Sequence, residues 1–385
     1  MQSSNAQPAR SRHLVTTRQG VAEVTAHRQP ARAGILMVNL GTPDAPTAKA
    51  LRPYLKQFLG DPRVVEVPRP IWWLILNGVI LPFRAPKSAK AYAEVWTNEG
   101  SPLLFNNRRL AEKLATELEP DLPDVSLELA MSYGQPSIQA ALERMKANNV
   151  QRLLVLPMYP QYSATTTASV FDQVTTWMQG QRFFPELRFI NDFYRESSWQ
   201  EAIADSVRRH QAEHGKPDKL LFSFHGIPKR NLQAGDPYYC QCQFSARKIA
   251  ERLNLGEDDW QVSFQSRLGR AEWLKPYTDH TLEALGHAGV KKLQVICPGF
   301  SIDCLETLEE IAMEGKEEFV EAGGEDLQYI PCLNESDDHV AVLKQLCLRH
   351  GQGWPEFEGR CSEPEDHVRT RLEQADKAAV TLNLE

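Results

Sequence analysis

Lys219-Leu-Leu-Phe-Ser-Phe-His225 is an almost continuous apolar run that ends in a histidine and is followed by Gly226. An uninterrupted apolar run of this length is typical of a strand that is buried on both faces of a parallel sheet. Ile35-Leu-Met-Val-Asn-Leu40, which is followed by Gly41, has the same pattern in the other half of the chain. The two runs predict buried parallel strands in both halves.

Similar strand candidates lie at 125–133, 152–157, 261–266 and 292–297, with helical stretches such as 137–148 between them. Two longer pieces, 132–163 and 267–303, share the order strand end, Gly turn, helix, strand and Pro-containing loop, at an offset of about 135–140 residues. This repeat predicts an α/β protein with two similar Rossmann-like lobes. Each lobe is expected to be an open parallel sheet flanked by helices, with a cleft between the lobes.

Composition shifts along the chain predict its domain boundaries. We expect a disordered leader at 1–32, an N-terminal lobe at 33–190 and a C-terminal lobe at 191–338. A C-terminal helix is expected at 339–352 and a loose tail at 353–385. The apolar stretch at 69–84 is interpreted as a lid on the first lobe or, alternatively, as an ordinary core helix.

The overall composition excludes several classes of protein. The 385 residues are 42% hydrophobic and 24% charged, which is typical of a globular protein and not of a collagen, a coiled coil or a disordered chain. The net charge of −7 offers no basic surface for nucleic acid. The N-terminus lacks the apolar segment of a secretory signal, and the 14 residues of Pro70–Phe83 are too few to span a bilayer. We therefore expect a cytoplasmic protein.

Common cofactor and nucleophile motifs are missing from the sequence. No G-x-G-x-x-G follows a strand, and no P-loop, G-x-S-x-G elbow, H-E-x-x-H or paired C-x-x-C occurs. Seven scattered cysteines indicate free thiols in a reducing compartment. Cys240 and Cys242 supply only half of a four-thiolate set, so we do not expect an iron–sulfur cluster.

The residues that follow the strands carry the candidate chemistry, because ligands of open α/β sheets bind beyond the carboxyl ends of the strands. His225 lies at such an end and would be a base or metal ligand, or simply a hydrogen-bonded structural histidine. Asp303, Glu306 and Glu310 fall at i, i+3 and i+7 of a predicted helix. Carboxylates facing an imidazole would suit hydrated divalent iron. Alternatively, Asp303 and Glu306 form a capping box.

Other loops offer contacts for a flat apolar ligand. The segment 159–167 combines two tyrosines with hydroxyl residues, and 235–242 places a turn and two aromatics after His225. Arg267 would bind an anionic substrate or make a surface ion pair. Trp72 and Trp73 would present an apolar face to a hydrophobic ligand or a membrane surface.

Six segments in order resemble ferrochelatases, and together they cover the chain from about Gly34 to Arg349. The segments are Val38-Asn-Leu-Gly-Thr-Pro43, Trp96-Thr-Asn-Glu-Gly-Ser-Pro-Leu103, Tyr159-Pro-Gln-Tyr-Ser163, Ser223-Phe-His-Gly226 with Gly235-Asp-Pro-Tyr238, Phe264-Gln-Ser-Arg267 with Trp273-Leu-Lys-Pro-Tyr-Thr-Asp279, and Cys297-Pro-Gly-Phe-Ser-Ile-Asp-Cys-Leu-Glu-Thr-Leu-Glu-Glu310. The last segment is similar to proteobacterial members. Some relatives have a histidine at the position of Cys304.

The resemblance implies a lyase that inserts Fe²⁺ into protoporphyrin IX with release of two protons, the last step of haem biosynthesis. It implies that His225 and Glu306 are the catalytic residues and iron ligands, with Asp303 and Glu310 on a path for the metal. The expected porphyrin contacts are Tyr159, Tyr162, Ser163, Tyr238, Trp72, Trp73 and Arg267.

The resemblance also sets expectations for partners. Iron is expected as a substrate, with no permanently bound cofactor. Expected contacts are the porphyrin, a porphyrin-producing oxidase upstream and, transiently, the inner face of the cytoplasmic membrane. Three other functions are considered: a chelatase for cobalt or for another tetrapyrrole such as coproporphyrin, a non-catalytic haem or metal carrier, and a periplasmic two-lobed binding protein.

Overall fold

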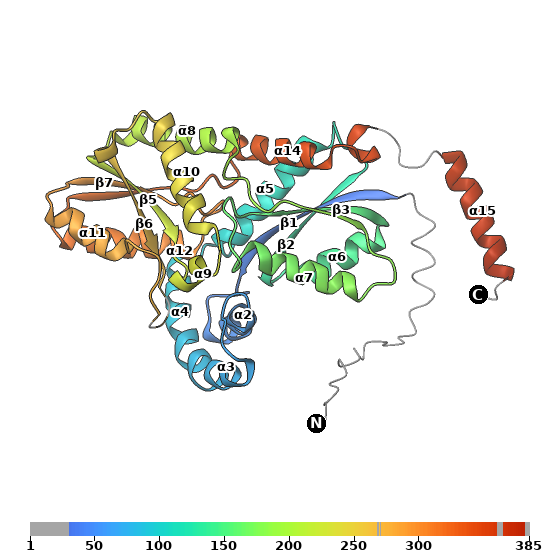
Figure 1. Cartoon of the computed structure of the whole chain (residues 1–385), viewed down its shortest axis with the longest axis horizontal. Coiled ribbons are helices and arrows are strands. Elements are labelled where there is room, and N and C mark those ends of the chain that lie inside the picture. The colour runs from blue at the N-terminus through green and yellow to red at the C-terminus, as the bar shows by residue number, and fades with distance from the viewer. Residues whose placement is uncertain (1–30, 268, 270, 360–364, 382–385) are drawn as a thin grey trace, which may run out of the picture.

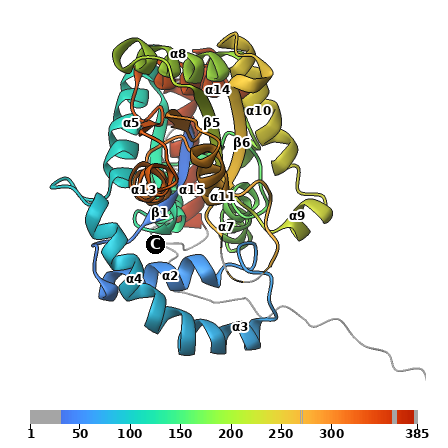
Figure 2. The same cartoon turned by 90° about the vertical axis from the view of Figure 1, so that its left-hand side faces the viewer.

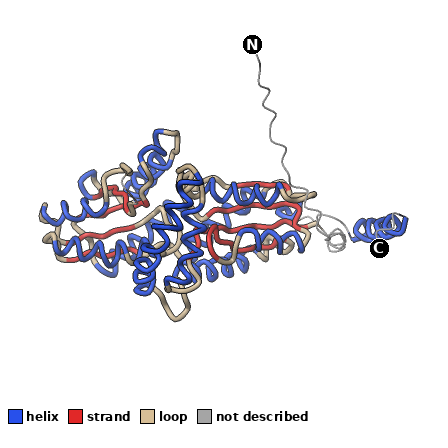
Figure 3. Tube along the Cα trace, turned by 90° about the horizontal axis from the view of Figure 1, so that it is seen from below, coloured by secondary structure: helices blue, strands red, loops and turns tan. Residues whose placement is uncertain are grey.

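The computed structural model describes residues 31–267, 269, 271–359 and 365–381 (Figure 1). Its strands form two four-stranded parallel sheets, one in each half of the molecule (Figure 3). The first has the order β2 (Val125–Gly134), β1 (Arg32–Thr42), β3 (Val150–Pro157), β4 (Glu186–Phe189). The second has the order β6 (Trp260–Gln265), β5 (Lys219–His225), β7 (Lys292–Ile296), β8 (Asp326–Ile330). The two orders are equivalent, which confirms the predicted pair of similar lobes.

The apolar runs form the central strands because both faces of each sheet are covered. In β1, seven consecutive residues from Gly34 to Leu40 are buried or nearly so, and in β5 the buried residues run from Leu220 to Phe224. Both strands hydrogen-bond to a parallel neighbour on each side. The edge strands β4 and β8 were not predicted, because Glu-Leu-Arg-Phe and Asp-Leu-Gln-Tyr-Ile are short and partly polar.

Helices cover both faces of each sheet. Those of the first lobe are α2 (Ala48–Gly60), α3 (Arg69–Ile75), the π-helix η1 (Leu76–Ile80), α4 (Leu81–Val95), α5 (Pro102–Leu118), α6 (Ile138–Ala147) and α7 (Thr167–Gln179). Those of the second lobe are α8 (Ser197–His214), α9 (Lys229–Gln233), α10 (Tyr238–Arg252), η2 (Glu257–Asp259), α11 (Thr278–His287), α12 (Leu305–Leu308), the π-helix η3 (Glu310–Gly315) and α13 (Lys316–Glu321). Helices α2, α3 and α4 extend below the first sheet as a separate layer (Figures 1 and 2).

The C-terminal part of the chain differs from the expectation. Helix α14 (Asp337–Gly351) packs on α5 and β3 of the first lobe and on α8 of the second. The tail expected at 353–385 contains the helices η4 (Pro355–Glu358) and α15 (Glu365–Thr381), while 360–364 and 382–385 lie outside the described residues. Trp354 is 2% exposed, and the Arg188 guanidinium lies 4.3 Å above its ring centre, so burial of this aromatic fixes the chain there. The strand β1 begins at Arg32, and most of the predicted leader lies outside the described residues.

The two lobes share one hydrophobic core. Its members include Met158 and Ile190 from the first lobe and Phe222 and Ile249 from the second. Because burial of apolar surface is the main stabilising term, this shared core holds the lobes together as one body. The sheets and their loops therefore have fixed relative positions.

Candidate active site

His225 is the last residue of β5 and is half-buried. Its Nδ1 lies 2.6 Å from the carbonyl oxygen of Gly226. Since a carbonyl oxygen can only accept, Nδ1 is the protonated nitrogen, and the Nε2 lone pair is left for a proton or a metal ion. The rings of Trp273 and Phe300 lie 6.5 and 6.4 Å away, centre to centre. The structure thus gives His225 a defined tautomer between two aromatic side chains.

Glu306 lies in the first turn of α12, and the helix cap does not use its carboxylate. The backbone N–H of Cys304 donates to the hydroxyl of Thr307 at 3.0 Å. The predicted capping box of Asp303 with Glu306 is therefore wrong, because the helix begins at Leu305 and the N3 position falls on Thr307. The half-buried Glu306 side chain is left available for chemistry.

Glu306 faces helices α2 and α4 of the first lobe. Burial raises the pKa of Tyr54 and of Tyr92, and the negative charge of Glu306 raises both further. Burial lowers the pKa of the Arg84 guanidinium, while Glu306 opposes that shift. These couplings place the carboxylate among two tyrosines and an arginine that sequence reasoning did not single out. In the sequence, the only indication of these three residues was that Arg84 directly follows the apolar stretch Pro70–Phe83.

Gln265 connects the two candidate residues. It is the partner of His225 in the β5–β6 register, and its Nε2 donates to the backbone oxygen of Glu306 at 2.5 Å. Its Oε1 accepts from the Ser223 hydroxyl at 2.7 Å, and the side chain is almost fully buried. An amide held at both ends has little freedom, so the end of β5 and the start of α12 are fixed relative to each other.

The charges of both His225 and Glu306 influence the pKa of Glu310. Burial raises the pKa of its carboxyl most strongly, and the negative charge of Glu306 raises it further. Hydrogen bonds from the backbone N–H and the hydroxyl of Ser266, together with the nearby imidazole of His225, act in the opposite direction. Glu310 is thus coupled to both His225 and Glu306, and its place on a path for the metal stays a prediction.

Asp303 does not continue the predicted row of carboxylates. It is 6% exposed and accepts hydrogen bonds from Tyr329 at 2.5 Å, Asn334 at 2.7 Å and Thr307 at 3.1 Å. The i, i+3, i+7 spacing fails because Asp303 precedes the helix and the π-helix η3 begins at Glu310. Its carboxylate holds the loop before α12 in place, and the expectation that it lies on a path for the metal stays a prediction.

Ser163 and Tyr238, both predicted to contact porphyrin, lie in the packing between the lobes. The hydroxyl of Ser163 donates to Asp236 of the second lobe at 3.0 Å, and the backbone N–H of Ala164 donates to the same carboxylate at 2.8 Å. Tyr238 belongs to the shared core and is 7% exposed. Neither side chain forms an open surface for a ligand.

The remaining loop candidates are more accessible. Tyr159 and Tyr162 are half-buried, and the backbone N–H of Tyr162 donates to Gln241 at 2.7 Å. Arg267 is exposed but pairs with Asp279, and its guanidinium lies 4.1 Å above the ring centre of Tyr277. Within that loop, Gln265 and Ser266 are the residues that hydrogen-bond to Glu306 and Glu310.

The stretch 69–84 combines the two alternatives, because Leu76 and Leu81 are buried in a core cluster while most of α3 is exposed, and its role as a lid stays a prediction. Helix α3 contains no buried residue. Trp72 is half-buried and donates from Nε1 to the backbone oxygen of Leu59 at 2.6 Å, whereas Trp73 is 60% exposed. The apolar patch consists of the exposed side chains of Ile71, Trp73, Leu74, Ile75, Val79 and Phe83.

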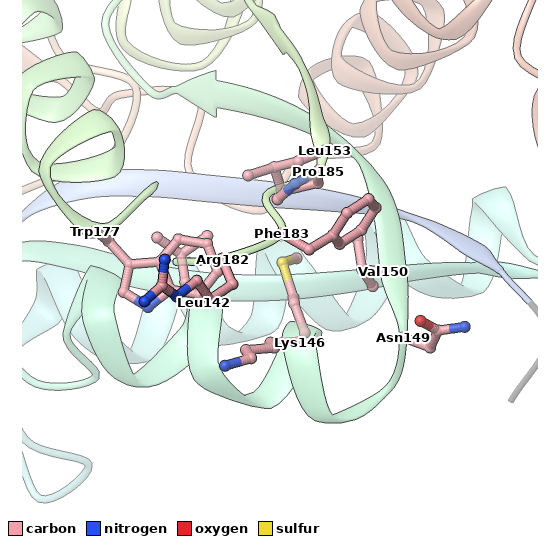
Figure 4. A pocket seen from close by; sticks show the side chains of 10 residues that line it. Leu142, Lys146, Asn149, Val150, Leu153, Trp177, Arg182, Phe183 and Pro185 are labelled. Atoms are coloured by element: carbon pink, nitrogen blue, oxygen red, sulfur yellow. The ribbon is translucent and has the colours of Figure 1, made fainter. Parts of the chain in front are cut away.

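A separate hollow of about 90 Å³ lies elsewhere in the first lobe (Figure 4). Leu142, Trp177 and Phe183 line it, together with Val150 at the start of β3. Because β3 begins there, this hollow is at the amino end of the strands, away from the loops that follow them. It is distinct from the candidate active site.

Within the described residues, no group of three or more His, Cys, Asp or Glu side chains is arranged to hold a metal ion. Cys240 is exposed and Cys242 is buried on α10, and Cys361 lies outside the described residues. The expectation that no iron–sulfur cluster is present stays a prediction.

Comparison with known proteins shows which family the chain belongs to. The model of the ferrochelatase family matches residues 32–351. A ferrochelatase of Thioalkalivibrio sulfidiphilus is 57% identical over 86% of this chain and 90% of that protein. A ferrochelatase of Nitrosococcus oceani is 52% identical over the same shares.

A solved structure of SirB from Bacillus subtilis with Fe³⁺ shares the fold, with a TM-score of 0.51 at 8% identity, over 83% of this chain and 96% of that one. The match to the family model and the identity of these relatives confirm the resemblance that the six sequence segments indicated. The chain therefore belongs to the ferrochelatase family, the lyases that insert iron into a porphyrin in haem synthesis.

Proposed function

We propose that His225 and Glu306 carry out the insertion of Fe²⁺ into protoporphyrin IX, with release of two protons. The observation that carries this assignment is the Gln265 side chain, which ties the end of β5 to the backbone of Glu306. A base and a carboxylate held in register can act on one bound ion, because catalysis requires such groups within reach of the same reacting atoms.

Two tasks have to be divided between these residues. The pyrrole nitrogens must lose two protons, and the iron must exchange water ligands for porphyrin nitrogens. The Nε2 lone pair of His225 can accept a proton or bind iron, and the carboxylate of Glu306 can replace water ligands or accept the second proton. Glu310, whose pKa both groups influence, can receive a proton or pass the ion onward.

The Glu306→Gln variant tests the carboxylate. Because Thr307, and not Glu306, closes the helix cap, this variant should keep the fold and lose iron insertion. The measurement is the metalloporphyrin spectrum after anaerobic incubation with Fe²⁺ and protoporphyrin. Glu317→Gln, an exposed change on α13, is the matched control. Wild-type turnover in Glu306→Gln would remove this carboxylate from the mechanism.

The His225→Ala variant tests the imidazole. It should still bind porphyrin, as followed by the Soret band, but should not insert iron. His287→Ala is the control, because His287 is exposed and its Nδ1 bonds only within α11. A normal insertion rate in His225→Ala would contradict the proposal. The same assays with Co²⁺ and with coproporphyrin compare the alternative metal and substrate, and tight binding without insertion would indicate a carrier.

Contact with a membrane surface is proposed for the lid. Residues 48–90 carry eight Lys and Arg but only two Asp and Glu, a net charge of +6 in a chain whose overall charge is −7. The exposed apolar patch lies in the same segment. A basic surface next to exposed tryptophan and aliphatic side chains suits an anionic bilayer interface.

Within the described ranges, no helix is long and apolar enough to cross a membrane. We propose a cytoplasmic protein that touches the inner face of the membrane and receives its porphyrin from an oxidase upstream. Fe²⁺ enters as a substrate, and no permanently bound cofactor is included in the proposal.

A further inference from the structure

A cavity of about 380 Å³ lies between α2 and the helices of the lid. Its walls are formed by Lys56, Gln57 and Gly60 from α2 and by Arg69, Trp72, Trp73, Leu76 and Asn77 from α3 and η1. The cavity combines two cationic side chains with two indole rings. This composition fits a ligand that is anionic at one end and apolar at the other.

The cationic wall that α2 gives the cavity lies on a different side of this helix from Tyr54. At about 100° per residue, Lys56 and Gly60 lie about 160° and 120° around α2 from the buried Tyr54, whereas Gln57 lies about 60° from it. Tyr54 is the α2 residue that Glu306 influences. Lys56 therefore lies on the other side of α2 from the residue that Glu306 influences.

The two cations of the cavity have no acidic partner among the described residues. Lys56 and Arg69 are exposed and come from different helices, and neither makes an ion pair in the part of the chain that the structure covers. Elsewhere on the surface, arginines such as Arg63 and Arg230 do pair with carboxylates. Two unpaired cations that line one cavity suit a phosphate or carboxylate group.

The apolar patch continues from the cavity. Trp73 lines the cavity and is 60% exposed, and the exposed Leu74 and Ile75 follow it directly along the chain. A phospholipid has the same sequence of chemistry, with a charged headgroup next to acyl chains. Tryptophan at the border between the two matches its usual position at membrane interfaces.

We propose that this cavity binds the headgroup of an anionic phospholipid of the phosphatidylglycerol class. The phosphate would lie between Lys56 and Arg69, with Trp72 and Trp73 against the glycerol and the start of the acyl chains. This inference rests on the membrane contact proposed above and adds a defined headgroup site to it. The site would hold the lid at the bilayer in one orientation.

The main test compares two double variants with equal loss of charge. Lys56→Gln with Arg69→Gln removes the cations of the cavity, whereas Lys49→Gln with Arg52→Gln removes two exposed cations of α2 outside it. Binding to vesicles of phosphatidylcholine with phosphatidylglycerol is measured by cosedimentation. Loss of two surface charges should weaken both variants similarly, and the cavity variant should lose about ten-fold more, because it also loses charge-assisted hydrogen bonds.

A second measurement separates the cavity from the membrane contact. Short-chain phosphatidylglycerol, kept below its micelle concentration, is titrated calorimetrically into the full-length protein. Binding that the cavity variant loses and the α2 control keeps would support the site. If inorganic phosphate binds as tightly as this lipid, the cavity is a plain anion site and the proposal is overturned.

The remaining outcomes are equally decisive. Equal losses of vesicle binding in the two double variants would leave the membrane contact standing and overturn the headgroup site. No vesicle binding by the wild-type protein would refute the membrane contact, while the short-chain titration would still decide the cavity. A raised KM for protoporphyrin in the cavity variant, without any change in lipid binding, would assign the cavity to the substrate instead.

Discussion

His339 makes the folded protein sensitive to acid. The residue is fully buried at the start of α14, and its Nδ1 donates to the backbone oxygen of Asn334 at 2.6 Å. Within the described residues its Nε2 is buried and has no hydrogen-bond partner. Burial lowers the pKa of His339 to about 4, against an ordinary value of 6.5. Protonation would therefore place a second N–H where nothing accepts it.

The sign of the pH effect follows from the direction of this shift. Since the folded pKa is below the unfolded pKa, the unfolded chain binds the proton first as the pH falls, and stability decreases with acidification. The loss begins as the pH drops through 6.5 and is complete near pH 4. A difference of 2.5 pKa units corresponds to about 3 kcal/mol of unfolding free energy.

The measurement is urea unfolding at several pH values between 7 and 4 for the wild-type protein and for His339→Asn. Asparagine keeps an N–H donor for the carbonyl of residue 334 but does not titrate, so the other ionisable groups cancel in the comparison. The stability difference between the two proteins should change by about 1.4 kcal/mol per pH unit below 6.5. A difference that stays constant over this range would refute the reasoning.

Four further substitutions, one of them a control, test the packing. Glu356→Gln should cost about 3 kcal/mol, because it leaves the Arg152 guanidinium without the buried carboxylate that it contacts at 2.6 Å; thermal unfolding measures this. Gly41→Ala should destabilise the protein strongly, because its φ is +106° and a Cβ would lie 1.8 Å from a backbone oxygen, whereas Gly60→Ala, with open space around it, should change the melting temperature little. Asp303→Asn should cost about 2–4 kcal/mol and raise the KM for iron, because unpaired donors would loosen the start of α12, and unchanged values of both quantities would contradict its structural role.

The central strands were predictable because their sequences are apolar on both faces. The runs that end at Leu40 and His225 form β1 and β5, and the repeat between the two halves correctly indicated two sheets of equivalent order. The edge strands β4 and β8 were not predictable, since both are short and partly polar, whereas β2 and β6 at the opposite edges were predicted. The positions of β4 and β8 depend on tertiary pairing with β3 and β7.

The site was predictable in part for a related reason. Ligands of open α/β sheets bind beyond the carboxyl ends of the strands, so His225 was identifiable as a candidate from its position at the end of a buried strand. The roles of Asp303 and Glu306 could not be separated from spacing alone. A shift of the helix start to Leu305 decides which carboxylate the loop uses, and that shift depends on Tyr329 and Asn334, which lie far away in the sequence.

The path of α14 has a mechanical consequence for substrate entry. The chain passes from the first lobe to the second before α8, and it passes back before α14, and these two helices lie along the same edge of the molecule (Figures 1 and 2). Two lobes joined by one connecting segment can rotate widely apart, but two connecting segments on the same edge resist such rotation. A disc-shaped substrate would therefore slide in from the opposite edge, past α2 to α4, while the two halves stay nearly still.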